Sequence, residues 1–258
     1  MIYTIQNIAS LIKGEAVIIN DVQIEHLLFD SRKIYTPQSS LFFAIVGARR
    51  NGHQFIDEVY KKGVRSFVVS HEVDVKKFPE ANFIKVDDSL QALQTLGIEH
   101  RKNFNIPVIG ITGSNGKTIV KEWLYQLLHQ DYNIVRSPKS FNSQIGVPLS
   151  VWQMNEQHTL GIFEAGISKP REMDKLEKII QPTIGVLTNI GEAHSEGFNS
   201  LAQKEKEKRL LFRNAAIPDS VVINSINKEQ TSTAISAIYK SFGYTIIIPF
   251  NDDASIQN

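Results

Sequence analysis

The sequence predicts an α/β protein: a small mixed α/β domain followed by a mainly parallel, doubly wound sheet that carries a phosphate-binding loop. Short β-branched runs alternate with segments of helical apolar spacing along nearly the whole chain. Residues 106–118 combine a strand, a glycine-rich turn and the start of a helix. Because Pro107 disfavours helical backbone at Ile106, we predict one domain at 1–105 and a second, incomplete at its C-terminal end, at 106–258.

The first domain is expected to contain four strands and three helices. Compact runs rich in β-branched and aromatic residues predict the strands at 17–22, 41–46, 66–70 and 82–86. Helical spacing of apolar residues predicts helices at 4–13, 53–62 and 88–104. Gly14 and Gly63 follow the first two helices, at the position where glycine commonly ends a helix.

In the second domain, strands and helices alternate with short connections, which is typical of a parallel sheet covered on both faces. We expect strands at 107–112, 133–136, 159–164, 183–188, 220–224 and 244–248. We expect helices at 117–130, 142–151, 171–179, 200–213 and 229–240.

Composition excludes several classes of function. The formal net charge of +1 gives no overall attraction to nucleic acid or to an anionic membrane, so anion binding has to be local. The absence of cysteine excludes disulfides, thiolate nucleophiles and cysteine-based zinc sites. No stretch has the apolar length of a membrane span, and the N-terminal residues lack the pattern of a signal peptide. We therefore expect a cytoplasmic protein with neither nucleic acid nor membrane as partner.

The 106–118 stretch ends in Gly-Lys-Thr, the tail of a phosphate-binding loop. Gly113 and Gly116 permit positive φ, and the N–H groups that open the next helix point at an anion. In such a loop Lys117 would reach the terminal phosphates of a nucleotide and Thr118 would ligate Mg²⁺. The full motif has a glycine six residues before the lysine, where this chain has Ile111. An ordinary strand-to-helix turn is therefore the alternative.

Polar residues follow four predicted strands of the second domain, at the sheet edge where ligands of such folds bind. They are residues 112–115, Glu164, residues 188–194 and Asn224. Taken alone, Glu164 fits a helix cap or loop residue equally well, His194 fits an exposed histidine, and Asn224 fits a turn.

Seven motifs occur together in one order: 30–32 (DSR), 41–44 (LFFA), 51–55 (NGHQF), 112–118 (TGSNGKT), 141–148 (FNSQIGVP), 164–170 (EAGISKP) and 189–198 (NIGEAHSEGF). They resemble the ATP-dependent Mur ligases of peptidoglycan synthesis, and most closely the type that adds D-Ala-D-Ala (MurF type). The resemblance covers nearly the whole chain. It also accounts for Ile111, because the loop of this family normally lacks the first glycine.

The resemblance implies a reaction and its cofactors, ATP and Mg²⁺. A carboxylate of UDP-MurNAc-tripeptide attacks the γ-phosphate of ATP, and the amine of D-Ala-D-Ala attacks the resulting acyl phosphate. Repulsion between two anions has to be overcome, so cations and positioning should dominate catalysis. The implied nucleotide-binding residues are Gly113, Ser114, Asn115, Gly116, Lys117 and Thr118 in the loop, with Asn224 and Asn227 near the adenine.

The same resemblance implies a metal site and a modified lysine. Thr118, Glu164 and His194 match residues at or near the two Mg²⁺ ions. The expected catalytic set is Lys117, Glu164, His194 and Lys208. Lys208 falls where this type carries a carbamylated lysine, and Lys206 is a close competitor. Carbamylation requires a neutral amine, hence a lowered pKa, which fits only a partly buried helix face.

Substrate-binding residues are implied in both domains. Asp30, Ser31 and Arg32 match residues near the uridine nucleotide, although Arg32 would also fit an ion pair with a neighbouring carboxylate. Arg49, Asn51 and His53 lie in a matching loop. Asn142 matches a contact to substrate phosphate or metal, or simply caps the following helix.

Mur ligases have three domains, so the resemblance implies that residues 1–105 bind the UDP-sugar, that residues 106–258 bind ATP, and that the C-terminal ligase domain is absent. We therefore expect a fragment that does not complete ligation. A catalytically incomplete nucleotide-binding or UDP-sugar-binding module, the start of a fusion with an alanine racemase, and another Mur ligase type remain alternatives. A P-loop kinase or GTPase would need Asp-x-x-Gly and Asn-Lys-x-Asp motifs, which the sequence lacks.

Overall fold

The computed structural model describes residues 3–48, 50–191, 197–215, 235–238 and 245–248. The chain divides into two units. The first comprises Met1–Phe104 together with Val151–Glu156, and the second comprises Asn105–Ser150 and Gln157–Asn258. Each unit combines helices with a sheet, so the predicted α/β class is confirmed.

The first unit is built on a five-stranded sheet in the order β2-β7-β6-β5-β4. Its strands are β2 (Glu15–Val17), β4 (His26–Leu28), β5 (Ser40–Phe43), β6 (Ser66–Val69) and β7 (Asn82–Lys85). Only β2 runs antiparallel to its neighbour. Strands β1 (Tyr3–Thr4) and β3 (Gln23–Ile24) form a separate antiparallel pair. Aromatic side chains of the sheet, among them Phe42, Phe67 and Phe83, build the core against α2 (Ile56–Lys61).

The predicted strand at 17–22 is wrong, whereas the other three predicted strands of this unit are confirmed. Strand β2 ends at Val17 because a side chain takes over the backbone hydrogen bonds that follow. The Asn82 Oδ1 accepts from the N–H groups of Ile19 (2.8 Å) and Asn20 (3.1 Å), and its Nδ2 donates to the Asn20 carbonyl (2.9 Å). Val17 and Ile19 consequently remain exposed.

The three predicted helices of the first unit are confirmed as α1 (Ile5–Leu11), α2 and α3 (Ser89–Arg101). Thr4 and Asn7 form a reciprocal capping box at the start of α1. Asp88 caps α3 by accepting from the N–H groups of Leu90 and Gln91. Short 3₁₀ turns complete the unit: η1 (Pro37–Ser39), η2 (Gly52–Phe55) and η3 (Val75–Lys77).

A buried histidine joins the segment 151–156 to the rest of the first unit. His100 on α3 lies 3.1 Å from the Tyr3 hydroxyl through Nδ1 and 3.0 Å from the Met154 carbonyl through Nε2. Since a carbonyl only accepts, Nε2 carries the proton and Nδ1 accepts from Tyr3. Its ring packs 4.8 Å from that of Trp152, centroid to centroid. Burial lowers the pKa of His100 to about 4.

We expect the free energy of unfolding to fall as the pH falls from 6.5 toward 4. Because the folded pKa of His100 lies below its unfolded value, the unfolded state binds more protons in this window, which costs about 2–3 kcal/mol of stability by pH 4. Urea denaturation followed by Trp152 fluorescence in a Trp123→Phe background measures it. His100→Gln should flatten the curve; an unchanged acid slope in this variant would contradict the assignment.

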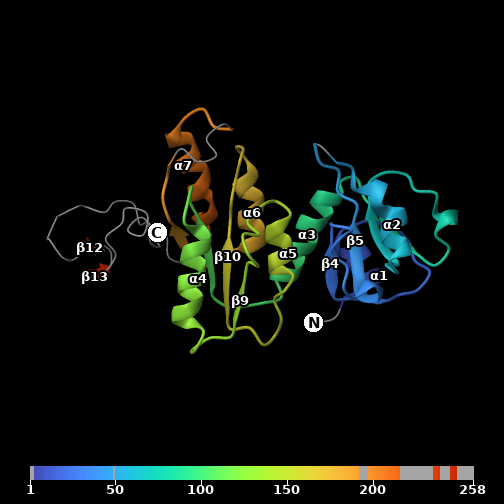
Figure 1. Cartoon of the computed structure of the whole chain (residues 1–258), viewed down its shortest axis with the longest axis horizontal. Coiled ribbons are helices and arrows are strands. Elements are labelled where there is room, and N and C mark those ends of the chain that lie inside the picture. Colours follow the sequence, from blue (N-terminus) through green and yellow to red (C-terminus); the bar gives the residue numbers. More distant parts are fainter. Residues whose placement is uncertain (1–2, 49, 192–196, 216–234, 239–244, 249–258) are drawn as a thin grey trace. The chain divides into compact units, whose positions relative to one another are not determined.

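The second unit contains a four-stranded, wholly parallel sheet in the order β11-β8-β10-β9. Its strands are β8 (Val108–Thr112), β9 (Ile134–Arg136), β10 (Leu160–Glu164) and β11 (Ile184–Leu187). Helices α4 (Lys117–Leu128), α5 (Gly146–Val151), α6 (Glu172–Ile180) and α7 (Leu201–Arg209) connect or follow them, and η4 (Leu210–Phe212) extends α7. Figure 1 shows the sheet lying between α4 on one side and α5 and α6 on the other. These strands and helices confirm the predictions for residues 107–213.

The last described residues form an antiparallel pair, β12 (Ile235–Ile238) and β13 (Thr245–Ile248). The strand predicted at 244–248 is thus present, but it pairs with β12 and not with the parallel sheet. The predicted helix at 229–240 is wrong at 235–238, where Ile235 and Ile238 fit a strand better than a helix. The strand predicted at 220–224 lies outside the described residues. Among the helices that the structure describes, none is long and apolar enough to cross a membrane.

Candidate functional site

The glycine-rich loop lies between β8 and α4, as predicted. Gly113 and Gly116 have φ values of +148° and +80°. A Cβ atom on Gly113 would lie 1.9 Å from the Thr188 Oγ1, so only glycine fits there. Gly116 precedes α4 and has no side chain with which to cap it. An anion therefore meets no competing N-cap side chain at the first N–H groups of this helix.

The segment after β11 holds the glycine-rich loop in place. Asn189 accepts from two loop N–H groups: its carbonyl from Ser114 (2.9 Å) and its Oδ1 from Asn115 (2.8 Å). The Ser114 hydroxyl exchanges hydrogen bonds with the carbonyl and the N–H of Gly191. Thr188 donates to the Asn115 carbonyl at 2.5 Å. Hydrogen bonds from the residues that follow β11 thus fix Ser114 and Asn115 of the loop.

Three lysines gather at this loop. The Nζ atoms of Lys117 and Lys208 donate to the Gly113 carbonyl at 2.8 and 2.9 Å, and that of Lys204 donates to the Gly191 carbonyl at 2.6 Å. Burial, then Lys117 and Lys204, lower the pKa of Lys208 to about 7. Burial also lowers the pKa of Lys117 and of Lys204. Partly buried positive charges that repel one another favour a polyvalent anion such as a triphosphate.

The structure separates Lys208 from its competitor. Lys208 is buried against the loop, whereas Lys206 points into solvent from the opposite side of α7. The buried environment of Lys208 favours the neutral amine that carbamylation requires. The helix that carries both has the alternating charges expected of an exposed face, but Lys204 and Lys208 lie four residues apart on its buried side.

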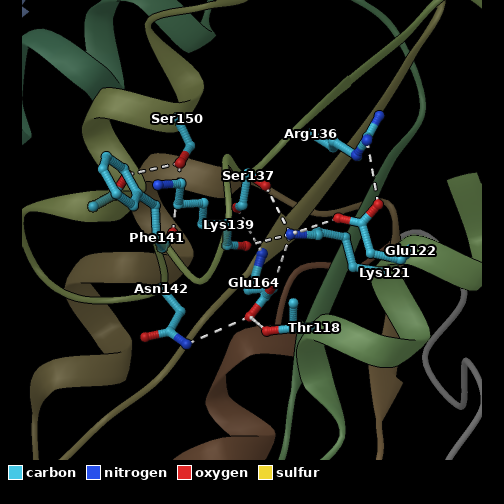
Figure 2. A network of polar contacts seen from close by, with 11 residues as sticks. Thr118, Lys121, Glu122, Arg136, Ser137, Lys139, Phe141, Asn142, Ser150 and Glu164 are labelled. Atoms are coloured by element: carbon cyan, nitrogen blue, oxygen red, sulfur yellow. Dashed lines mark hydrogen bonds and ion pairs between the residues drawn. The ribbon is translucent and has the colours of Figure 1, made fainter.

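Glu164, at the end of β10, lies at the centre of a polar network (Figure 2). Its Oε2 accepts from the Thr118 hydroxyl at 3.0 Å and from the Asn142 Nδ2 at 3.4 Å. Its Oε1 forms an ion pair with Lys121 at 3.0 Å, and both side chains are fully buried. Sequence reasoning placed Thr118, Glu164 and Asn142 in the site, and the structure brings all three together.

These oxygen donors fit magnesium. Mg²⁺ is usually held by one or two carboxylates, with waters and substrate phosphates completing its coordination, and a Thr hydroxyl beside a carboxylate is such a set. No group of three or more His, Cys, Asp or Glu side chains that could hold a metal ion occurs in the part of the chain that the structure describes. A metal at Thr118 and Glu164 would therefore need oxygen ligands from a bound phosphate.

In the first unit, Asp30 and Arg32 form an ion pair with each other. Arg32 donates from Nε and Nη2 to the two carboxylate oxygens of Asp30, both at 2.8 Å, while its side chain remains largely exposed. This hydrogen bonding holds the pKa of Asp30 at about 2. Ser31 is buried, and its carbonyl accepts from Lys62. The neighbouring-carboxylate alternative for Arg32 is therefore the arrangement observed.

Asn51 and His53 lie together in a rigid loop. The Asn51 Oδ1 lies 2.7 Å from the His53 Nδ1, and the His53 Nε2 accepts from the N–H groups of Ser70 (3.0 Å) and His71 (3.1 Å). The proton thus sits on Nδ1. Burial and the nearby His71 lower the pKa of His53 to about 4. One ring nitrogen thus binds Asn51 within the loop, and the other joins the loop to the segment after β6. Four other predicted site residues lie outside the described residues: Arg49, His194, Asn224 and Asn227.

Sequence reasoning missed Lys121 and Lys204. A signal existed for Lys121, which lies one turn after Lys117 on the face of α4 that also carries the buried Val120 and the partly buried Leu124. A lysine in an inward-facing position needs a buried partner, and the nearest carboxylate on a facing strand is Glu164. Asn189 belongs to the polar segment 188–194 that the sequence placed at this sheet edge, but its hydrogen bonds to the loop became visible only in the structure.

Comparison with known proteins finds one family and a consistent set of relatives. The Mur ligase middle domain model matches residues 111–257. The UDP-N-acetylmuramoyl-tripeptide–D-alanyl-D-alanine ligase of Bacillus subtilis (strain 168) is 33% identical over 248 residues, which cover 93% of this chain and 52% of the relative. The ligase of the same name from Rickettsia prowazekii is 33% identical over 231 residues, covering 90% and 50%. The chain thus spans about half the length of these relatives.

Solved structures share the fold. MurF from Acinetobacter baumannii superimposes with a TM-score of 0.83 at 23% identity, covering 100% of this chain and 63% of that one. MurF from Thermotoga maritima, solved in complex with ADP, gives a TM-score of 0.71 at 22% identity over 90% of this chain and 60% of that one.

Proposed function

We propose that this chain, which belongs to the Mur ligase family as its sequence predicts, serves the ATP-dependent joining of D-Ala-D-Ala to UDP-N-acetylmuramoyl-tripeptide. One observation carries the proposal: the Thr118 hydroxyl and the Glu164 carboxylate meet beside a phosphate-type loop that three lysines surround. The two relatives described above, both UDP-N-acetylmuramoyl-tripeptide–D-alanyl-D-alanine ligases, are similar to almost the whole of this chain.

We infer the following roles in the second unit. The loop residues Gly113–Thr118 would receive the phosphates of ATP, with Lys117 turning from the Gly113 carbonyl to the terminal phosphate. Thr118 and Glu164 would hold Mg²⁺, which supplies positive charge where the substrate carboxylate approaches the γ-phosphate. Catalysis rests on lowering the repulsion between the two anions and on holding them in line. We also propose that His194 belongs to the metal site and that Asn224 and Asn227 contact the adenine.

Lys208 is the residue that we propose to be carbamylated. The ammonium group would first lose one proton. The neutral Nζ would then attack CO₂, forming an N–C bond as one C=O bond becomes a C–O⁻, and releasing a second proton, so that a cation becomes an anionic carbamate. The lowered pKa makes the neutral amine abundant near pH 7. Carbamate formation would also remove the electrostatic repulsion between a positively charged Lys208 and its neighbours Lys117 and Lys204.

We propose that the first unit binds the UDP-sugar through Asp30, Ser31, Arg32, Arg49, Asn51 and His53. Asn142, which belongs to the second unit, is proposed separately as a contact to substrate phosphate or metal. Arg32 would have to exchange its Asp30 partner for a diphosphate, which its exposure permits. Asn51 and His53 would act by fixing the loop, since they bind each other and His53 also binds the backbone of residues 70 and 71 after β6. We also propose that the protein acts in the cytoplasm, because both proposed substrates, ATP and a UDP-linked precursor, are found there.

Calorimetric titration with nucleotides and with the sugar nucleotide tests this function. We expect the chain to bind MgATP and UDP-MurNAc-tripeptide but not GTP, since the guanine-reading Asn-Lys-x-Asp motif is absent from the sequence. UDP-glucose serves as the control for the sugar-peptide part of the substrate. Equal affinity for GTP and ATP, or failure to bind either ATP or UDP-MurNAc-tripeptide, would contradict the proposal.

A further inference from the structure

Lys121 is a buried lysine that the proposed reaction leaves without a role. Its Nζ donates to the Ser137 carbonyl at 2.8 Å and to the Lys139 carbonyl, and it forms ion pairs with Glu164 (3.0 Å) and Glu122 (3.1 Å). Its side chain is 0% exposed. An ammonium group has three hydrogens, and four oxygens surround this one. All three N–H donors of Lys121 are therefore engaged within the protein, so Lys121 has no spare donor for a nucleotide. Lys117, one turn earlier, is the lysine proposed to bind the phosphate.

Lys121 binds one oxygen of the Glu164 carboxylate and leaves the other oxygen for the Thr118 side of the site. Oε1 faces the Lys121 ammonium group, so Oε2 is turned toward the Thr118 hydroxyl and the Asn142 amide (Figure 2). The Ser137 hydroxyl fixes the backbone by accepting from the Glu164 N–H at 3.1 Å. A fully buried carboxylate is costly without a cation beside it, and Lys121 is the cation that meets this one.

One side chain also joins the three segments that carry the oxygen and amide groups of the site. Lys121 itself belongs to α4, which supplies Thr118. The carbonyls that it binds belong to residues 137–139, which lead into Asn142. Its ion-pair partner Glu164 closes β10. Loss of this side chain would release all three segments at once.

We propose that Lys121 is a positioning residue of the metal site, which orients Glu164 so that Oε2 and Thr118 face a Mg²⁺–nucleotide. This inference rests on the proposed function, because it presupposes that the site binds a metal–nucleotide complex. Groups that orient metal ligands in this way typically change metal affinity 10- to 100-fold when they are removed. The predicted consequence is specific: metal-dependent binding weakens, whereas binding of the nucleotide alone does not.

The test compares ADP binding in EDTA with ADP binding in Mn²⁺ or Mg²⁺, by calorimetry, for the wild-type chain and Lys121→Met. We expect the affinity in EDTA to be unchanged, because the loop and Lys117 are untouched, and the gain in affinity from metal to drop about 10-fold. Glu122→Gln is the matched control. It removes the other carboxylate from Lys121 but leaves Glu164 paired, so the gain from metal should persist.

Lys121→Arg keeps the test decisive if the methionine variant does not fold. Its planar guanidinium retains the charge but cannot place donors on the same carbonyls and carboxylate, so the gain from metal should also decrease. Full retention in Lys121→Arg would show that charge alone suffices and overturn the proposal. Equal losses with and without metal would overturn it in favour of a general structural role. A wild-type chain that binds no adenine nucleotide overturns the proposed function itself, and this inference with it.

Discussion

Replacing Lys117 by Met weakens ATP binding by about 10- to 100-fold, the value expected when a charge-assisted hydrogen bond to phosphate is lost. In the free chain the Lys117 ammonium group donates to the Gly113 carbonyl at 2.8 Å and to the Ser114 carbonyl at 3.3 Å, both within the loop. Burial lowers its pKa, so the charge is held at a cost. A phosphate would repay that cost.

The pattern across nucleotides identifies the phosphate that Lys117 meets. Because the residue is assigned to the terminal phosphates, the loss of affinity should grow from AMP through ADP to ATP. Titration calorimetry of the three nucleotides measures it. Lys206→Met is the matched control, since this lysine is exposed on α7 and should leave all three affinities unchanged. Equal losses for AMP and ATP would contradict the assignment.

The loss should not arise from unfolding. Removing a buried charge relieves its desolvation, and Met fills a similar volume, so the free energy of unfolding of Lys117→Met should not decrease. A variant that loses ATP binding and stability together would indicate that Lys117 serves the loop more than the ligand.

Most of the second unit was predictable because its signals are local. Strands β8, β10 and β11 are short, mostly apolar runs that are largely buried on both faces, and glycines or prolines separate each from the next helix. The loop was equally clear, since Gly113 and Gly116 are needed by the backbone itself. Arg171, directly before α6, has a backbone conformation that usually favours glycine. Its φ of +68° is the left-handed conformation that glycine adopts at no cost.

Long-range partners escaped prediction. The end of β2 depends on the Asn82 side chain, more than sixty residues away in sequence, and no pattern within 17–22 reveals it. The Lys121–Glu164 ion pair likewise joins helix α4 to strand β10, and two other elements lie between them in the sequence. For the same reason, the choice between Lys206 and Lys208 needed coordinates: the sequence shows an alternating charge run, and only packing shows which lysines face inward.

The same inward-facing position makes Lys208 the source of a large pH effect. Its pKa in the folded chain is about 7, well below the ordinary value of 10.5, because the amine is buried and lies near Lys117 and Lys204. Between these two pKa values the unfolded state binds more protons than the folded state. The free energy of unfolding should therefore rise as the pH rises from about 7 toward 10.5, and the full penalty applies below pH 7.

Lys208→Met should remove this penalty. We expect the variant to be more stable than the wild-type chain at pH 6.5 by about 2–4 kcal/mol, which is the pKa shift converted to free energy less the lost hydrogen bond to the Gly113 carbonyl. The difference should shrink as the pH is raised. Urea denaturation in steps from pH 6.5 to 9.5, without added bicarbonate, measures it.

Lys206→Met again provides the control, because an exposed lysine should leave the pH profile unchanged. Parallel profiles for Lys208→Met and the wild-type chain would mean that Lys208 titrates normally. The neutral amine on which carbamylation depends would then be scarce at pH 7, and the proposed modification would fail with it. A steeper wild-type profile that Lys208→Met flattens would instead place the titrating amine beside the loop, where an anionic carbamate would lie next to Lys117.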